Sequence, residues 1–355
     1  MFLELDMRKM IQTHASGLLL SLLMAALSLT LAQSEQLQSW GLGSLTLAIL
    51  LGLILGNLPL ATSRAQHWNT GLQFSKQQLL RAGIVLYGLR LSLRDIGNVG
   101  LPGLMVDLVM LISTLWLTAF LGRRVFRLPR ELTLLIGAGS AICGAAAILA
   151  AAPVLRSKEE DTGIAISGVV FFGTCSMLLY PLFFQSELLL NWSGLSPAAI
   201  GIYTGATLHE VAQVVVAGKA MTPQIADVAI VTKMMRVMLL APALCVLALL
   251  VSPVRQAAKA DHTNWRLRLA DISIPWFAVL FVLVIVLQSL LSVPPAVRQL
   301  FAQLDQILLS AAMFALGFST RLASLRKAGW KPLLLAGSIW CWLMLGGLLI
   351  SQLIL

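Results

Sequence analysis

Apolar residues gather into runs along the chain, and polar residues separate the runs. A helix needs about 20 apolar residues to cross a hydrocarbon core about 30 Å thick. The runs are of that length, so the pattern predicts an all-α polytopic membrane protein with about eleven transmembrane helices. They are expected near residues 15–32, 43–61, 77–95, 99–121, 132–154, 163–185, 199–219, 226–252, 273–293, 303–321 and 332–354.

Spans two and seven share a glycine spacing that suggests an internal repeat. Gly43 and Gly56 in one match Gly205 and Gly218 in the other. Five spans separate the partners, an odd number, so the two copies would have opposite orientation, as in many secondary transporters. The predicted organisation is an N-terminal segment with an extra helix (1–40) followed by two five-helix repeats (41–190 and 191–355). Chance alignment of simple apolar sequence is the alternative.

Spans five and ten hold equivalent places in these repeats, and both are rich in small residues. Span five carries Gly137, Gly139 and Gly144, and span ten carries Ser310 to Gly317. Gly-interrupted segments at matching positions point to discontinuous, crossing helices that bind substrate. Close helix packing through small faces is the alternative. It accounts well for Gly317, whereas the three glycines of span five favour a break, because each costs helix about 1 kcal/mol.

Composition and charge agree with a membrane protein. Of the 355 residues 58% are hydrophobic and 11% are charged, and the net charge is +10. A soluble domain carries roughly 25% charged residues. With the N-terminus inside, sixteen of the 25 Lys and Arg fall in cytoplasmic segments and six outside. This is the positive-inside pattern, and it predicts a cytoplasmic N-terminus and a C-terminus on the opposite side, which is the periplasm if the membrane is a bacterial inner membrane.

Motifs for cofactor, metal or nucleophile chemistry do not stand out in the sequence. The four His and four Cys form no metal-ligand or disulfide pattern, and no phosphate-binding glycine loop or nucleophile elbow occurs. The basic charge is explained by cytoplasmic loops without a nucleic-acid partner. We therefore expect no cofactor, no metal and no enzymatic activity.

The densest polar cluster within an apolar run lies in span seven. A charge at the centre of a membrane helix costs about 2.5–3.5 kcal/mol, so such residues are functional candidates. His209 and Gln213 are four residues apart, and Glu210 and Gln213 are three apart, so each pair would share a helix face. We expect His209 and Glu210, with Asp107 in span four, to bind a coupling ion. An interfacial turn is the alternative for span seven, and a structural counter-ion is the alternative for Asp107.

Three basic residues within or at the ends of spans suggest an anion site. Lys233 and Arg236 share one face of span eight, and Arg81 takes the matching place in span three. A guanidinium fork suits oxyanions. The alternatives are that these side chains snorkel to the interface, or that they pair with Glu210. The full expected substrate site comprises Arg81, Arg236, Lys233, Gly139, Ser140, Cys143, Gly144 and Gln213.

Several of these motifs together resemble a known family. The stretches 45–57, 76–84, 136–147, 209–214, 233–242 and 274–277 are similar to the YeiH-like sulfate exporter family of bacterial membrane proteins. The likeness runs from about residue 40 to the C-terminus. It implies a plasma-membrane transporter, distantly grouped with the cation/proton antiporter and anion transporter superfamily, in which two five-helix halves cross at discontinuous helices.

The leading hypothesis is a secondary transporter that exports a small anion of the sulfate, sulfite or organosulfur type, coupled to H⁺ or Na⁺. In the alternative, a cation/proton antiporter, Glu210 and Asp107 bind the cation and the arginines are counter-charges. A membrane-embedded enzyme or sensory subunit is disfavoured by the absence of a soluble domain. The expected partners are the anion, the coupling ion and the lipid bilayer, and a second copy of the chain is a candidate partner.

Overall fold

A computed structural model describes residues 2–34, 36–37, 43–186, 194–240, 242–247, 276–291, 294–320 and 329–355, and every regular element in them is a helix. The predicted repeat boundaries at 40/41 and 190/191 lie outside these residues. So do the basic residues at positions 255–268 and 321–327, which were predicted to be cytoplasmic. Two compact units contain the helices.

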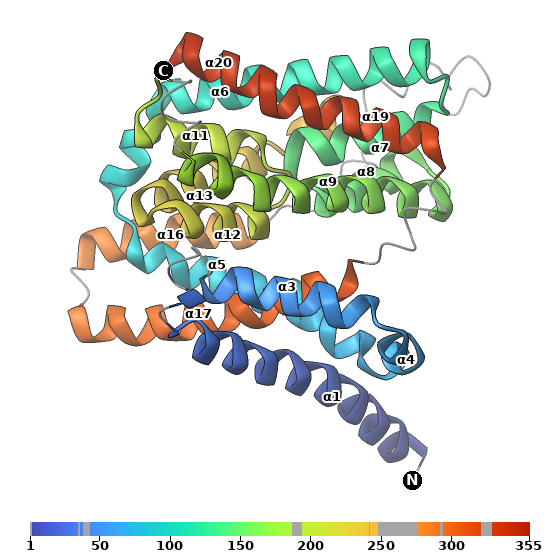
Figure 1. The fold of residues 1–355 in the computed structure, drawn as a ribbon, viewed down its shortest axis with the longest axis vertical. Helices are drawn as coiled ribbons and strands as arrows, with labels where there is room; N and C mark the ends of the chain where they lie inside the picture. Colours follow the sequence, from blue (N-terminus) through green and yellow to red (C-terminus); the bar gives the residue numbers. More distant parts are fainter. Residues whose placement is uncertain are drawn as a thin grey trace. The chain divides into compact units, whose positions relative to one another are not determined.

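Unit 1 combines Met1–Arg94 with Val279–Leu322. Its helices are α1 (Phe2–Leu31), α3 (Ser44–Asn57), α4 (Pro59–Phe74), α5 (Leu80–Tyr87), most of α16 (Trp276–Leu291) and α17 (Pro295–Ser319). Within this unit α3 and α17 lie side by side, although more than 230 residues separate them in the chain (Figure 1).

Glycines bring α3 and α17 into backbone contact. A Cβ on Gly317 would collide with the carbonyl oxygen of Ile49, and one on Gly52 with that of Phe314. Helices in lipid associate through such small faces, because close approach of the backbones is what stabilises the pair. Span ten is α17, one continuous helix, so the expected break in it is wrong. The small residues of span ten serve helix packing instead.

Gly317→Ala is expected to weaken unit 1 by about 1–3 kcal/mol, because the added methyl group meets backbone atoms that cannot move alone. Thermal unfolding of the purified protein in detergent would measure the loss. Gly43→Ala is the matched control, since a Cβ at the start of α3 meets nothing within 4 Å. Equal stability of the two variants would contradict the close packing.

An ion pair that the sequence analysis missed fixes the end of span three to α17. Arg90 contacts the Asp305 carboxylate at 2.9 Å and donates to the Ala302 carbonyl at 2.7 Å. Asp305 is fully buried, whereas the Arg90 side chain is 34% exposed. The signal in the sequence was a lone carboxylate inside an apolar span, which requires a partner.

Unit 2 combines Asp95–Ala278 with Ala323–Leu355. Its helices are most of α6 (Leu93–Phe120), α7 (Arg130–Ala138), α8 (Ala145–Leu155), α9 (Glu159–Gln185), α11 (Pro197–Thr207), α12 (Val211–Met221), α13 (Pro223–Met238), α19 (Trp330–Cys341) and α20 (Gly347–Ile354). Short π-helical turns continue α7 through Cys143 and join α19 to α20. α6 is kinked at Gly100, where φ is +50°.

Helix length explains why the described chain shows fewer long spans than the sequence predicts. Five stretches are long and apolar enough to cross a membrane: Val99–Val125, Glu159–Gln185, Pro223–Leu247, Ala296–Ser319 and Trp330–Ile354. Spans five and seven are absent from this group because each is divided into two shorter helices. The total of eleven spans and the inverted repeat stay predictions.

Candidate functional site

Span five is interrupted at Gly144, which we call the first break. α7 runs into a π-helical turn, Gly139–Cys143, and α8 starts at Ala145. Gly144 has φ +70° and ψ −135°, a conformation that an L side chain rarely adopts and that glycine adopts readily. The interruption that the glycines of span five predicted is therefore confirmed.

Span seven is interrupted at Leu208-His209-Glu210, which we call the second break. α11 ends at Thr207 and α12 begins at Val211. Glu210 caps α12 in a capping box, in which its backbone N–H donates to Gln213 Oε1 at 3.1 Å. The predicted adjacency of Glu210 and Gln213 is confirmed. His209 lies in the break, outside either helix, so its predicted helical face shared with Gln213 is wrong.

The two breaks meet at the Glu210 carboxylate. Its Oε1 accepts a hydrogen bond from the N–H of Ala145, the first residue of α8, at 3.3 Å. A Cβ on Gly144 would collide with the Glu210 side chain, so the glycine also makes room for this contact. Helix N-termini carry partial positive charge. One carboxylate therefore stabilises the N-terminal ends of both α8 and α12.

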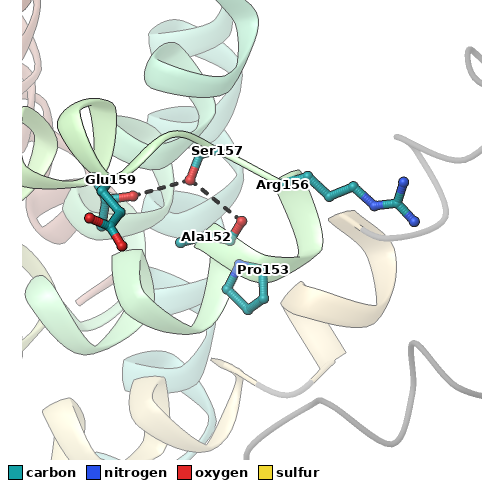
Figure 2. Close-up of a pocket in the computed structure, with 6 residues that line it drawn as sticks. Ala152, Pro153, Arg156, Ser157 and Glu159 are labelled. Carbon is teal, nitrogen blue, oxygen red and sulfur yellow. Dashed lines mark hydrogen bonds between the residues drawn. The ribbon is translucent and has the colours of Figure 1, made fainter.

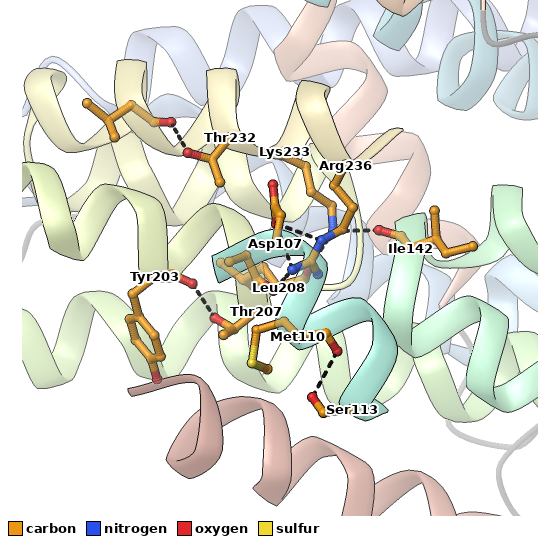
Figure 3. A network of polar contacts seen from close by, with 12 residues as sticks. Asp107, Met110, Ser113, Ile142, Tyr203, Thr207, Leu208, Thr232, Lys233 and Arg236 are labelled. Atoms are coloured by element: carbon orange, nitrogen blue, oxygen red, sulfur yellow. Dashed lines mark hydrogen bonds and ion pairs between the residues drawn. The ribbon is translucent and has the colours of Figure 1, made fainter. Parts of the chain in front are cut away.

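Lys233 of α13 makes the complementary contact with the C-terminal ends. Its Nζ donates to the carbonyl of Ile142 at 3.0 Å and to that of Leu208 at 2.5 Å. Ile142 lies just before the first break and Leu208 in the second (Figure 3). Lys233 is fully buried, so the alternative that its side chain snorkels to the membrane interface is wrong. Its ammonium satisfies carbonyls that the ends of both helices leave without a helical partner.

Arg236, one turn further along α13, forms a buried ion pair with Asp107 of α6. Arg236 Nε lies 2.9 Å and Nη2 2.8 Å from Asp107 Oδ1, and both side chains are 0% exposed (Figure 3). Arg236 Nη2 also donates to the carbonyl of Ala206, in the last turn of α11. The partner of Arg236 is thus Asp107, not Glu210 as one alternative held.

We call Asp107, Ser140, His209, Glu210, Lys233 and Arg236 the cluster. Its formal charges balance, since the two cations, Lys233 and Arg236, accompany the two carboxylates of Asp107 and Glu210. Some polar capacity is nevertheless unused. Among the described residues, four buried atoms of the cluster lack a hydrogen-bond partner: Ser140 Oγ, His209 Nδ1, Asp107 Oδ2 and Arg236 Nη1. Buried polar groups without partners cost stability. Their presence beside two helix breaks is what a site for a polar ligand or ion would show.

Aromatic and small side chains shape the surroundings of the second break. Tyr180 of α9 donates to Thr207 Oγ1 at 2.9 Å and stacks on Tyr203 with ring centroids 5.2 Å apart. Gly173 of α9 leaves room for the Gln213 amide, which a Cβ there would strike. These contacts hold the end of α11 and the start of α12 against α9.

The structure brings together most of the residues that the sequence nominated. Unit 2 contains ten of these residues, and all of them are buried: Asp107, Gly139, Ser140, Cys143, Gly144, His209, Glu210, Gln213, Lys233 and Arg236. Gly139 packs against Ile148 and Val169. Arg81 lies at the start of α5 in unit 1, where it is exposed, so a site shared by Arg81 and Arg236 stays a prediction.

Sequence reasoning missed the backbone groups that make these contacts. These groups are the carbonyls of Ile142, Ala206 and Leu208 and the N–H of Ala145. They belong to residues with apolar side chains, which carry no chemical signal in the sequence. It also missed the second break. The signal for it was a His-Glu pair in a short apolar run, without glycine or proline at the break itself.

Helix lengths place both breaks near the middle of their spans. α8, α11 and α12 have 11 residues each, and 1.5 Å per residue gives each a length of about 16 Å. That is about half of a 30 Å hydrocarbon core.

A pocket of about 410 Å³ lies where α8 ends and α9 begins, lined by residues that include Arg156, Ser157 and Glu159 (Figure 2). It is one half-helix length from the first break.

Comparison with known proteins agrees with this membrane architecture. A family model described as "Conserved hypothetical protein 698" matches residues 16–336. A UPF0324 membrane protein of Pseudomonas aeruginosa is 48% identical over 97% of this chain and 96% of its own length. The UPF0324 inner membrane protein YeiH of Escherichia coli K12 is 42% identical over 93% of this chain and 91% of its own. YeiH of Salmonella typhi is 43% identical over 95% and 93%.

No solved structure matches this chain. The sequence matches nevertheless extend over nearly all of it and include both breaks and α13, since the family model covers residues 16–336. The relatives are themselves named as membrane proteins, in agreement with the apolar helices of the structure. The chain is therefore a membrane protein that belongs to the UPF0324 family, the YeiH-like family.

Proposed function

We propose that this protein is a secondary transporter of the bacterial inner membrane that exports a small anion of the sulfate, sulfite or organosulfur type. The observation that carries the proposal is the buried cluster of two cations and two carboxylates at two helix breaks. Irregular backbone at membrane depth is tolerated only where protein buries it or a cavity contains it. Broken helices near the midplane are a recurring substrate site in secondary transporters.

The direction of the helix ends supports an anionic substrate. The N-termini of α8 and α12 meet at the Glu210 carboxylate, and N–H groups at such ends bind anions. Arg236 has one unpartnered nitrogen, Nη1, in the same cluster, and the hydroxyl of Ser140 is also unpartnered among the described residues. In this proposal the anion accepts hydrogen bonds from these donors. The proposed topology has the N-terminus of the chain in the cytoplasm and the C-terminus in the periplasm.

Glu210 and His209 are the proposed carriers of the coupling ion, H⁺ or Na⁺. Glu210 touches both breaks, so a change in its charge alters both helix ends at once. His209 Nδ1 has no hydrogen-bond partner among the described residues and is free to take a proton or a ligand. Loss of the negative charge on Glu210 would release the N-termini of α8 and α12 for a substrate anion.

A cation/proton antiporter is the second candidate function. It is favoured by a specific observation: Arg236 is paired with Asp107, and Lys233 is bound to two carbonyls. Both cations thus have internal partners, as counter-charges would. In this candidate, Asp107 and Glu210 exchange their contacts for a cation and protons.

Glu210→Gln is expected to reduce transport at least about tenfold, because glutamine keeps an oxygen that can accept from Ala145 but is permanently neutral, so it cannot bind and release a coupling ion. Transport would be measured in proteoliposomes with labelled sulfate, sulfite, thiosulfate and taurine, with and without a pH or Na⁺ gradient. Glu160→Gln, at an exposed position in the first turn of α9, is the control. Anion flux that is unchanged in Glu210→Gln would contradict the coupling role. Flux of Na⁺ or H⁺ without any anion requirement would favour the antiporter.

A further inference from the structure

Lys233 occupies a position that would otherwise suit a small inorganic cation. Its ammonium is fully buried and lies within hydrogen-bond distance of two carbonyl oxygens, those of Ile142 and Leu208. The first belongs to the turn that ends the first half of span five, and the second follows the last residue of α11. The two half-helices therefore direct their C-terminal ends at one nitrogen atom.

Such ends attract cations for a general reason. The last carbonyls of a helix have no helical partner and carry the negative end of the helix dipole. Unwound carbonyls and half-helix C-termini are also the groups that coordinate Na⁺ in transporters with broken helices. Here a covalently attached ammonium fills this place. It is held by α13, which packs against both α11 and α12.

The other charged and titratable groups near Lys233 are distributed over all the elements of the cluster. Arg236 lies one turn away on α13, Cys143 follows Ile142, and His209 and Glu210 follow Leu208. Asp107 approaches from α6 through its ion pair with Arg236. With two positive and two negative side chains, the cluster is neutral without any bound metal ion. A further cation would add an uncompensated charge in a buried place, which is costly.

We propose that Lys233 is a resident cation that substitutes for Na⁺ at the meeting point of the two half-helix C-termini, so that this protein works without binding Na⁺. The inference rests on the proposed function in one respect: if the protein does not bind Na⁺, H⁺ is left as the coupling ion of anion export. The binding place itself follows from the contacts of Lys233. Removing the ammonium opens this place to a small monovalent cation from solution.

The test compares thermal unfolding midpoints of the purified full chain in chlorides of sodium, methylammonium and choline at equal ionic strength. Wild-type protein is expected to unfold at the same temperature in all three salts. In choline chloride, Lys233→Ala is expected to unfold at a lower temperature than wild type, because choline is too large to enter the site that the ammonium leaves. Saturating methylammonium or sodium should raise its midpoint by about 5 °C or more through mass action.

Two further variants make the test specific. Lys233→Met fills the place with an apolar chain, so its midpoint should be low in every salt. Lys158→Ala, at an exposed position before α9, should behave like wild type. If Lys233→Ala does not yield folded protein in choline chloride, purification in methylammonium chloride should recover it. Failure of every cation to recover or stabilise Lys233→Ala would overturn the proposal, and so would specific stabilisation of wild type by Na⁺.

The proposed function can fail separately. Anion transport that strictly requires Na⁺ in wild type would overturn the inference and leave anion export intact. A wild-type protein that is indifferent to Na⁺ and to every anion, together with cation rescue of Lys233→Ala, would support the resident cation and count against anion export.

Discussion

Arg236→Ala is expected to lower the free energy of unfolding by about 3–5 kcal/mol and to abolish transport. Arg236 and Asp107 are both fully buried and bonded to each other, so removing one leaves an uncompensated charge in a low-dielectric interior. The substitution also leaves the carbonyl of Ala206 without its donor, at the end of α11. Chemical or thermal unfolding in detergent would measure the first effect, and flux into proteoliposomes the second.

A double variant separates the structural from the functional share of this pair. Asp107→Leu combined with Arg236→Met replaces the ion pair by apolar side chains, a change that is often neutral or stabilising. We expect it to regain most of the stability lost in Arg236→Ala but none of the transport. Recovery of transport as well would mean that the pair serves the fold alone. Arg94→Ala, at an exposed position, is the control for loss of a positive charge and should match wild type.

Gly144→Ala is expected to have the second largest effect. Backbone strain at φ +70° and ψ −135° costs about 1–3 kcal/mol for a residue with a Cβ. The added methyl group would also collide with the Glu210 side chain and push the carboxylate away from the N–H of Ala145. Both stability and transport should fall, and unfolding and flux measurements would show the two losses.

Two comparisons identify the cause of the Gly144→Ala effect. Gly163→Ala places alanine within α9, where a Cβ meets nothing within 4 Å, so it should be neutral or slightly stabilising. Gly144→Ala in a Glu210→Ala background removes the collision and retains the strain. A double-mutant cycle then gives the part due to the contact. A coupling energy near zero would show that the contact between the two breaks is unimportant.

The internal repeat shows how far pattern reasoning reaches in this chain. Matching spans two with seven and five with ten predicted that breaks would occur in spans five and ten. The structure has breaks in spans five and seven, whereas span ten is the continuous helix α17. Small residues in α17 and in span five look alike in sequence. In α17 they admit the backbone of α3, where Gly317 meets Ile49, whereas in span five Gly144 adopts a positive φ.

The sequence by itself determined the class of the protein, because hydropathy and segment length respond directly to the bilayer. It also identified the ionisable residues of the candidate site, since a charge in an apolar run is costly and therefore conspicuous. Gly144 could be anticipated as well, because glycine has no Cβ and adopts backbone conformations that other residues resist.

Only the tertiary structure decided which charges meet. Asp107 and Arg236 are 129 residues apart, and Lys233 bonds to carbonyls that lie 91 and 25 residues away. Those carbonyls belong to Ile142 and Leu208, whose side chains give no sign of the role. A backbone group becomes a ligand only when its helix ends without a partner for it. Where a helix ends, and what then faces that end, depends on contacts between segments distant in the chain, which local sequence does not specify.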